Sequence, residues 1–432
     1  MLQRKIWEKL AHWKNKPKRE CPIIHGVRQC GKTYIIRQFG MAAYQSVIEI
    51  NFIEKPEMLR VFSGNLDVRT LTQGISLLMP EAKFIPEKTL IFFDEIQECP
   101  NARTSLKFWA EDGRFDVIAS GSLLGMTYKD TFSVPVGYEL PLDMYPLDFT
   151  EFLWALGIDD EVINNLKSCC SGENPIPEHI HAAMMKYLRE YMVVGGMPEV
   201  VNSYLDTRNF HSVHNVQEKI LRDYQDDIAK YADNSDRIKA RTCYLSIPRQ
   251  LTKENHKFQY SVVEKKGTAR KFESSIDWLR EAGMITNSIN VSTPEFPLMA
   301  YEKPDQFRVY LSDIGLFCAM FGFQMKEALL NDTLEGSAKG GLYESLIADM
   351  LYKQHENLHY YKKDDSSLVI EFLLERDASV VPVEVKANRG TTKSLNELLK
   401  KEQIRKGYKL SSQNAGIVGK KISLPLYMAA FL

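Results

Sequence analysis

The segment PIIHGVRQCGKTYIIRQF, at residues 22–39, constrains the fold of this chain more than any other. A short apolar run leads into Gly26, four residues follow, and Gly31, Lys32 and Thr33 precede a helical pattern. This is the GxxxxGKT spacing in the strand–loop–helix context of a phosphate-binding loop. Glycine lets backbone N–H groups approach a phosphate without a Cβ in the way, and the following helix N-terminus attracts the anion. The segment therefore predicts a nucleotide-binding α/β domain.

A second apolar segment, KTLIFFDEIQECP at residues 88–100, ends in Asp94 and Glu95. A carboxylate at the tip of a buried strand is costly unless it meets a cation. We expect Asp94 to hold Mg²⁺, directly or through water, and Glu95 to orient and deprotonate the attacking water. We expect Lys32 to reach the β- and γ-phosphates of ATP and the Thr33 hydroxyl to ligate the Mg²⁺. Together the two segments predict a Mg²⁺-dependent ATPase.

Short apolar segments alternate with helical stretches in the first third of the chain, which predicts a doubly wound α/β domain. The segment FDVIASGSLLG, at residues 115–125, ends in small polar residues. Because ligands bind at the carboxyl ends of parallel strands, Ser120 or Ser122 is a candidate contact for the γ-phosphate or the water, with an ordinary Ser-Gly turn as the alternative. The expected strands lie near 22–25, 46–52, 89–94, 116–121 and 137–141. The predicted nucleotide contacts are Gly26, Val27, Arg28, Gln29, Cys30, Gly31, Lys32, Thr33, Tyr34, Asp94 and Ser122.

The segments HGVRQCGKT, LIFFDEIQ, IASGSLL and ELPLDMYPLDFTEFL resemble prokaryotic AAA-type ATPases that carry a C-terminal domain of unknown function. Three downstream segments match that family too: YLREYMVVGGMPEVV, ILRDYQDDIAKY and VYLSDIGLFCAMFG. The resemblance implies a P-loop domain, a helical and winged-helix middle, and a C-terminal α/β fold similar to PD-(D/E)xK nucleases. The expected domains are a P-loop ATPase domain at 1–155, a helical lid or linker at 156–235, a winged helix at 236–328 and a nuclease-like domain at 329–432.

The middle of the chain offers basic residues for two purposes. AAA-type modules often carry an arginine that senses the γ-phosphate. The sequence does not choose among four candidate arginines. For each of them, a surface salt bridge is the alternative role. These candidates are Arg103, Arg114, Arg189 and Arg222. In the expected winged helix, a helix near 268–281 precedes a strand pair, and Lys257, Arg270 and Lys271 are candidates for DNA phosphates. The alternative is a winged helix that packs against other domains.

The segment SSLVIEFLLERDASVVPVEVK, at residues 366–386, reads as two hydrophobic strands joined by a polar turn. Glu371 lies in the first strand, and the period of two places Glu384 and Lys386 on one face of the second. With Glu344 on an upstream helix, the order of these residues is that of PD-(D/E)xK nucleases. Glu371 and Glu384 would hold Mg²⁺ or Mn²⁺, and Lys386 would position or deprotonate water. Glu344 would either complete the metal shell or orient Lys386.

One departure from the nuclease pattern and one alternative interpretation leave the activity of this hairpin open. That nuclease family has an aspartate where this chain has Glu371, and the added methylene moves the carboxylate. An amphipathic hairpin with its charges in water is the alternative. The sequence therefore supports two hypotheses: an ATP-driven, DNA-directed enzyme, or a nucleotide-dependent switch whose inactive nuclease-like domain is a scaffold for protein or DNA.

The composition narrows the setting. The net charge is −1, so any DNA contact must come from a local patch. Residues 386–421 contain ten Lys or Arg and two acids, which suits either a DNA groove or a solvated helix face. The seven cysteines show no CxxC pair, and no segment resembles a signal peptide or a membrane span. We expect a cytoplasmic protein with no membrane contact, and the resemblance to AAA-type modules adds an expected homo-oligomer.

Overall fold

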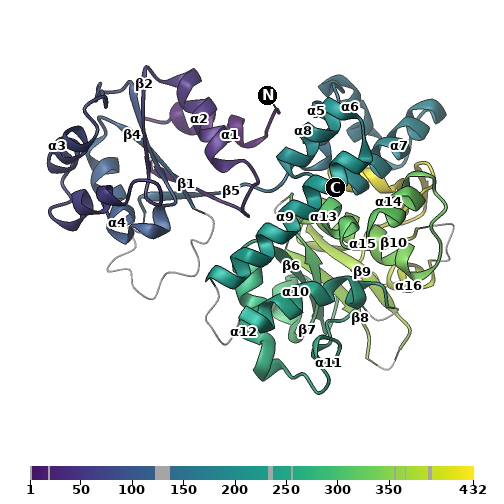
Figure 1. Cartoon of the computed structure of the whole chain (residues 1–432). Coiled ribbons are helices and arrows are strands. Elements are labelled where there is room, and N and C mark those ends of the chain that lie inside the picture. Colours follow the sequence, from purple (N-terminus) through teal and green to yellow (C-terminus); the bar gives the residue numbers. More distant parts are fainter. Residues whose placement is uncertain are drawn as a thin grey trace. The chain divides into compact units, whose positions relative to one another are not determined.

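The structure is a computed structural model, drawn in Figure 1. It describes residues 2–17, 20–121, 137–231, 237–253, 256–354, 357–364, 366–387 and 392–432. The chain divides into two compact units, an N-terminal unit made mainly of Gln3–Pro146 and a second unit made mainly of Leu147–Arg280 and Met284–Leu432.

The N-terminal unit contains a parallel five-stranded sheet with the order β2-β3-β4-β1-β5, which confirms the predicted α/β class. Chain order and sheet order differ because the chain returns from β4, beside β1, to β5 on the other side of β1. β1 is therefore an interior strand between β4 and β5. Ligands of such folds bind just outside the carboxyl ends of the strands. The strands are β1 (Cys21–His25), β2 (Ser46–Asn51), β3 (Thr89–Asp94), β4 (Asp116–Gly121) and β5 (Glu139–Asp143).

Every residue of β3 and β4 is buried, as expected for central parallel strands whose two faces are both covered. Phe93 of β3 packs edge-on against Phe62 and Trp109, and this aromatic group anchors the core of the unit. The rigid core fixes the position of the β3 carboxyl end. The helical elements around the sheet are α1 (Ile6–Lys14), α2 (Lys32–Ala43), η1 (Pro56–Ser63), α3 (Val68–Leu78), η2 (Ile96–Glu98) and α4 (Pro100–Asp112).

The second unit begins with a run of helices that includes the α12 expected near 268–281. A glycine pair follows α7, and its first member, Gly195, adopts a φ of 75°. A Cβ on Gly196 would lie 2.0 Å from the Leu147 carbonyl oxygen, so close backbone approach also requires glycine there. The helices are α5 (Phe149–Ala155), α6 (Asp160–Ser168), α7 (Glu178–Val194), α8 (Pro198–Thr207), α9 (Phe210–Tyr231), α10 (Arg237–Leu251), α11 (Tyr260–Val263), α12 (Ala269–Glu281), α13 (Ile314–Ala319), α14 (Phe323–Leu330), α15 (Gly336–Tyr352) and α16 (Lys393–Leu398).

A mixed eight-stranded sheet with the order β12-β13-β11-β10-β9-β8-β6-β7 completes the second unit. The strand pair expected in the winged helix, β6 and β7, forms one edge of this sheet, so the sheet crosses the boundary predicted at residue 328. Ser288 of β6 pairs with Leu358 of β8, and the Asn290 side chain bonds the Lys362 backbone. These contacts join the two expected domains into one sheet. The strands are β6 (Ile285–Val291), β7 (Glu302–Leu311), β8 (Leu358–Lys362), β9 (Val369–Arg376), β10 (Ser379–Val385), β11 (Gly407–Ser411), β12 (Gly416–Val418) and β13 (Lys421–Pro425).

Candidate functional site

The loop between β1 and α2 has the geometry of a phosphate-binding loop. Gly31, with a φ of 97°, precedes α2, which begins at Lys32. A Cβ on Gly26 would lie 2.1 Å from the Met144 carbonyl oxygen, so glycine is required at the start of the loop. The Met144 N–H in turn donates to the His25 carbonyl over 2.7 Å. The loop is therefore held between the end of β1 and the segment after β5.

The Lys32 side chain turns back into this loop. Its Nζ donates to the carbonyl oxygens of Gly26 over 2.8 Å and Val27 over 3.0 Å. The ammonium thus lies where the loop backbone curls, beside the α2 N-terminus that attracts anions. Of the other predicted contacts, Val27 and Cys30 are buried, whereas Arg28, Gln29 and Tyr34 are at least partly exposed.

Arg4 also belongs to this site, although no local pattern points to it, because the residue lies well upstream of the motif. Its buried guanidinium donates to the Cys30 carbonyl over 3.1 Å and to the Tyr145 carbonyl over 2.5 Å. Arg4 therefore ties the loop backbone to the segment that follows β5.

Asp94, the last residue of β3, lies beside the loop. Its carboxylate accepts hydrogen bonds from Thr33 Oγ1 at 3.2 and 3.3 Å, from Asn51 Nδ2 at 3.1 Å, and from the Ser120 hydroxyl. Burial and the neighbouring Glu95 carboxylate raise the pKa of Asp94, against the effect of the two hydroxyls. Asn51 was missed by the sequence reading, although its place at the carboxyl end of β2 was a usable signal.

These residues fit a Mg²⁺ ion. A partly desolvated carboxylate beside a threonine hydroxyl offers the hard oxygen ligands that this ion prefers, and Mg²⁺ usually takes only one or two protein carboxylates together with water and phosphate. Asn51 and Ser120 hold the Asp94 carboxylate in place, as partners of metal ligands do. Within the described residues, no group of three or more His, Cys, Asp or Glu side chains could hold a metal ion.

Glu95 follows at a turn with unusual backbone geometry. Its φ of 54° lies in the left-handed region, which non-glycine residues rarely adopt outside constrained sites. Its carboxylate accepts a 2.6 Å hydrogen bond from Gln97 Nε2 and remains partly exposed. Glu95 lies close enough to Asp94 for its negative charge to raise the pKa of that carboxyl. Ser122, another predicted contact, lies outside the described residues.

Two of the arginines considered as γ-phosphate sensors have partners within the N-terminal unit. Arg103 donates to Glu139 through two nitrogens, at 2.7 and 2.8 Å, and this buried pair joins α4 to β5. Arg114 pairs with Asp112 over 2.8 Å at the surface. These contacts favour structural roles for both residues.

A second cluster of charges lies on the antiparallel pair β9 and β10 and at Lys386, which directly follows β10. Lys386 Nζ is 3.0 Å from a Glu384 carboxylate oxygen and 3.8 Å from one of Glu371. Glu371 also accepts from the Val385 N–H over 3.2 Å, and Glu384 accepts from the Leu395 N–H over 3.3 Å. The structure thus brings the three residues together. Glu384 is buried and the other two are mostly buried, unlike a hairpin with its charges in water.

The electrostatics of this cluster are perturbed. Burial raises the pKa of Glu371 to about 7, although Lys386 opposes the rise. Burial alone would lower the pKa of Lys386, but the Glu371 and Glu384 carboxylates raise it overall. Lys409 of β11 lies opposite Glu384, and burial together with the nearby Lys421 lowers its pKa. Such perturbed groups are typical of functional sites, although structural ion pairs produce them too.

Glu344 of α15 has different partners. Its carboxylate accepts from Arg308 over 2.6 Å, from the Tyr310 hydroxyl, and pairs with His256 Nδ1 over 2.6 Å. Despite burial, Arg308 and His256 hold the pKa of Glu344 down, at about 2. Arg308, Tyr310 and His256 were not found from the sequence, because β7 and the segment before α11 are distant from α15 along the chain. Both oxygens of Glu344 are engaged by this set rather than by Lys386.

Family models divide the chain into three segments. Residues 18–153 match the model described as AAA domain. The N-terminal unit is supported as an AAA-type ATPase domain. Residues 185–327 match a domain of unknown function (DUF8612), and residues 339–427 match another (DUF4143). Neither description assigns an activity to the second unit, and the nuclease-like fold is not confirmed.

Known proteins add limited information. An uncharacterized protein of Methanocaldococcus jannaschii is 28% identical over 207 residues, which cover 48% of this chain and 40% of that protein. A Walker-type ATPase of Pyrococcus abyssi superposes with a TM-score of 0.43 at 15% identity, covering 74% of this chain and 96% of its own. The Aeropyrum pernix Orc1 protein, solved with DNA, has a TM-score of 0.28 at 13% identity, and the match covers 76% of this chain and 92% of the Orc1 chain.

No helix within the described residues is long and apolar enough to cross a membrane.

Proposed function

We propose that the N-terminal unit binds Mg²⁺-ATP and hydrolyses it. The observation that carries this proposal is the convergence of Lys32, Thr33 and Asp94 at the carboxyl ends of β1 and β3, with Thr33 Oγ1 3.2 Å from Asp94. The AAA-type family match supports the same activity.

Each residue of the site has a definite task in this reaction. Lys32 would exchange the Gly26 and Val27 carbonyls for the phosphates, and Thr33 and Asp94 would hold the Mg²⁺ ion. When bound, Mg²⁺ neutralises charge on the phosphate oxygens. Glu95 takes a proton from the attacking water, since its carboxylate stands one residue beyond Asp94 and is partly exposed.

Lys32→Ala tests nucleotide binding. Charge-assisted hydrogen bonds contribute about 1.5–3 kcal/mol, so we expect the Kd for ATP to rise by roughly 10- to 100-fold. Isothermal titration calorimetry with Mg²⁺-ATP measures this change. Lys107→Ala, an exposed lysine of α4 paired with Glu111, is the control and should leave the Kd unchanged. Equal affinities for wild type and Lys32→Ala would contradict the proposed site.

A second candidate function is metal-dependent phosphodiester cleavage by the second unit. The observation that favours it is the buried carboxylate pair, Glu371 and Glu384, which shares the Lys386 ammonium. Two oxygens from these carboxylates could hold Mg²⁺ or Mn²⁺ and leave Lys386 beside the reacting phosphate. The engagement of Glu344 with Arg308 removes one expected metal ligand and so supports the inactive nuclease-like domain of the other hypothesis, the nucleotide-dependent switch.

Lys386→Ala separates these two hypotheses. If the cluster is a nuclease site, wild type should cut plasmid or single-stranded DNA with Mg²⁺ or Mn²⁺, and Lys386→Ala should lose at least 100-fold of that rate, on the order of a general-base contribution. The reactions are run with and without ATP. Lys400→Ala removes an exposed lysine paired with Glu397 and controls for the general effect of losing a lysine charge. Equal cutting by all three proteins would exclude this site as the source, and DNA binding that follows nucleotide state without cutting would support the scaffold.

The wider predictions belong to the same proposal. Lys257, Arg270 and Lys271 stay candidates for DNA phosphates, although Lys271 pairs with Glu264 over 2.6 Å. The face formed by Lys386, Lys409 and Lys421 is a further candidate, because these ammonium groups lie on neighbouring strands. Self-association and a cytoplasmic location also remain predictions.

A further inference from the structure

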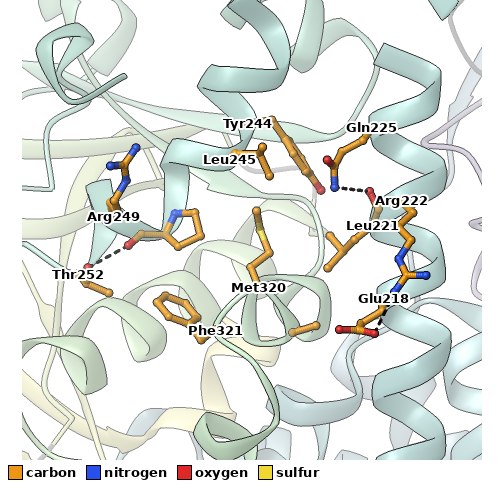
Figure 2. Close-up of a pocket in the computed structure, with 12 residues that line it drawn as sticks. Glu218, Leu221, Arg222, Gln225, Tyr244, Leu245, Arg249, Thr252, Met320 and Phe321 are labelled. Atoms are coloured by element: carbon orange, nitrogen blue, oxygen red, sulfur yellow. Dashed lines mark hydrogen bonds and ion pairs between the residues drawn. The ribbon is translucent and has the colours of Figure 1, made fainter. Parts of the chain in front are cut away.

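A pocket in the second unit is lined by none of the residues of the Glu371–Glu384–Lys386 cluster or of the group around Glu344. It has a volume of about 540 Å³ and lies between α9, α10 and the end of α13. Figure 2 shows the side chains that line it. This volume is within the range of about 300–1,000 Å³ that is usual for small-molecule sites. On α9, Leu221, Arg222 and Gln225 share one helix face toward the pocket, as their spacing requires.

The pocket offers an apolar surface for a flat ligand. Leu221 of α9, Met320 and Phe321 at the end of α13, and Pro248 of α10 contribute carbon and sulfur atoms. Pro248 lies inside α10 and has no N–H to donate to the Tyr244 carbonyl one turn earlier. Helix α10 therefore places the Pro248 ring at the pocket wall, in a turn that lacks one backbone hydrogen bond.

A buried hydroxyl group supplies the second observation. Tyr244 is 1% exposed, and its hydroxyl has no hydrogen-bond partner among the residues that the structure describes. Leaving such a group unpaired is costly, and a native structure rarely tolerates it without a reason. In Figure 2 the hydroxyl end of Tyr244 points toward the side of the pocket formed by Leu221 and Gln225. A polar group of a ligand in the pocket would meet it.

The rim of the pocket is positive. Arg222 and Arg249 come from different helices and lie on opposite sides of the pocket in Figure 2. Glu218 offsets part of this charge through its 3.4 Å contact with Arg222, which leaves one net positive charge on the lining. These charges favour an anion.

We propose that the pocket between α9, α10 and α13 binds a small organic anion with a flat apolar body and one phosphate, sulfonate or carboxylate group. The apolar body lies on Met320 and Phe321, the anionic group meets Arg222 or Arg249, and a polar atom of the ligand pairs with the Tyr244 hydroxyl. This proposal does not depend on ATP hydrolysis or on the β9–β10 cluster.

The test uses the full chain and a probe of this chemistry, 8-anilinonaphthalene-1-sulfonate. Fluorescence titration should show saturable binding at one site per chain. Arg222→Met/Arg249→Met should weaken binding by about 10-fold or more, because each charged hydrogen bond contributes about 1.5–3 kcal/mol. The neutral analogue N-phenyl-1-naphthylamine should bind wild type more weakly than the sulfonate does. On the double variant, the neutral analogue and the sulfonate should have equal affinities.

Two further variants make the test specific to the pocket. Tyr244→Phe should weaken probe binding by about 5-fold, since a neutral hydrogen bond contributes about 1 kcal/mol, and should raise the melting temperature of the free protein. Arg280→Met removes an exposed arginine of α12 that pairs with Asp277, outside the pocket, and should leave probe binding unchanged. Non-saturable binding, or one affinity shared by wild type and the double arginine variant, would overturn the proposal.

Discussion

Glu95→Gln should lower the rate of ATP hydrolysis by about 10²–10⁴-fold while the Kd for ATP changes little, because only the general base is removed. The substitution keeps the size of the side chain and its ability to meet Gln97, so the left-handed turn after β3 should persist. Phosphate release under saturating ATP measures turnover, and calorimetry on the same preparation measures binding.

The neighbouring Glu98 provides a matched control. It lies three residues on, in η2, and is exposed, so Glu98→Gln changes the same charge without touching the proposed water. We expect wild-type turnover from this variant. Wild-type turnover from Glu95→Gln would show that another group accepts the proton, and the ATPase site would then need a different base.

Arg308→Met should lower the free energy of unfolding of the second unit by about 3–5 kcal/mol at neutral pH, the usual cost of leaving one partner of a buried ion pair uncompensated. Glu344 would lose its 2.6 Å contact with Arg308 and keep only His256 and Tyr310 in a buried site. Urea denaturation, followed by a probe that reports on the second unit, measures the loss.

The pH dependence of this effect has a defined sign. The folded pKa of Glu344, about 2, lies below its ordinary value of 4.5. A lowered carboxyl pKa stabilises the fold fully above about pH 4.5, and this contribution disappears as the pH falls toward 2. The difference between wild type and Arg308→Met should therefore shrink between pH 5 and pH 2, as far as the second unit stays folded.

A double variant tests whether the loss comes from the unpaired carboxylate. Arg308→Met/Glu344→Gln removes both charges, so it should be more stable than Arg308→Met alone at neutral pH. A loss below about 1 kcal/mol for Arg308→Met would mean that water or His256 compensates Glu344.

Some of this molecule follows from short segments of sequence. The phosphate-binding loop, the acidic tip of β3 and the Glu-x-Lys strand are each contiguous, and their chemistry depends on residues a few positions apart. Alternation along 366–386 was enough to place Glu384 and Lys386 on one face, and the structure has both beside Glu371. Local periodicity determines such features because each side chain's direction follows from its own backbone.

Other features exist only because distant segments meet. Arg4 reaches the Cys30 carbonyl, Asn51 reaches Asp94, and Arg308 reaches Glu344, and in each case no local pattern announces the partner. The sheet that crosses residue 328 depends on the register of β6 against β8, which hydrogen bonds and side-chain packing set in three dimensions. The sequence by itself therefore determined the nucleotide motifs and the paired charges of the hairpin. The tertiary structure decided which buried groups hold them in place, because that depends on long-range packing.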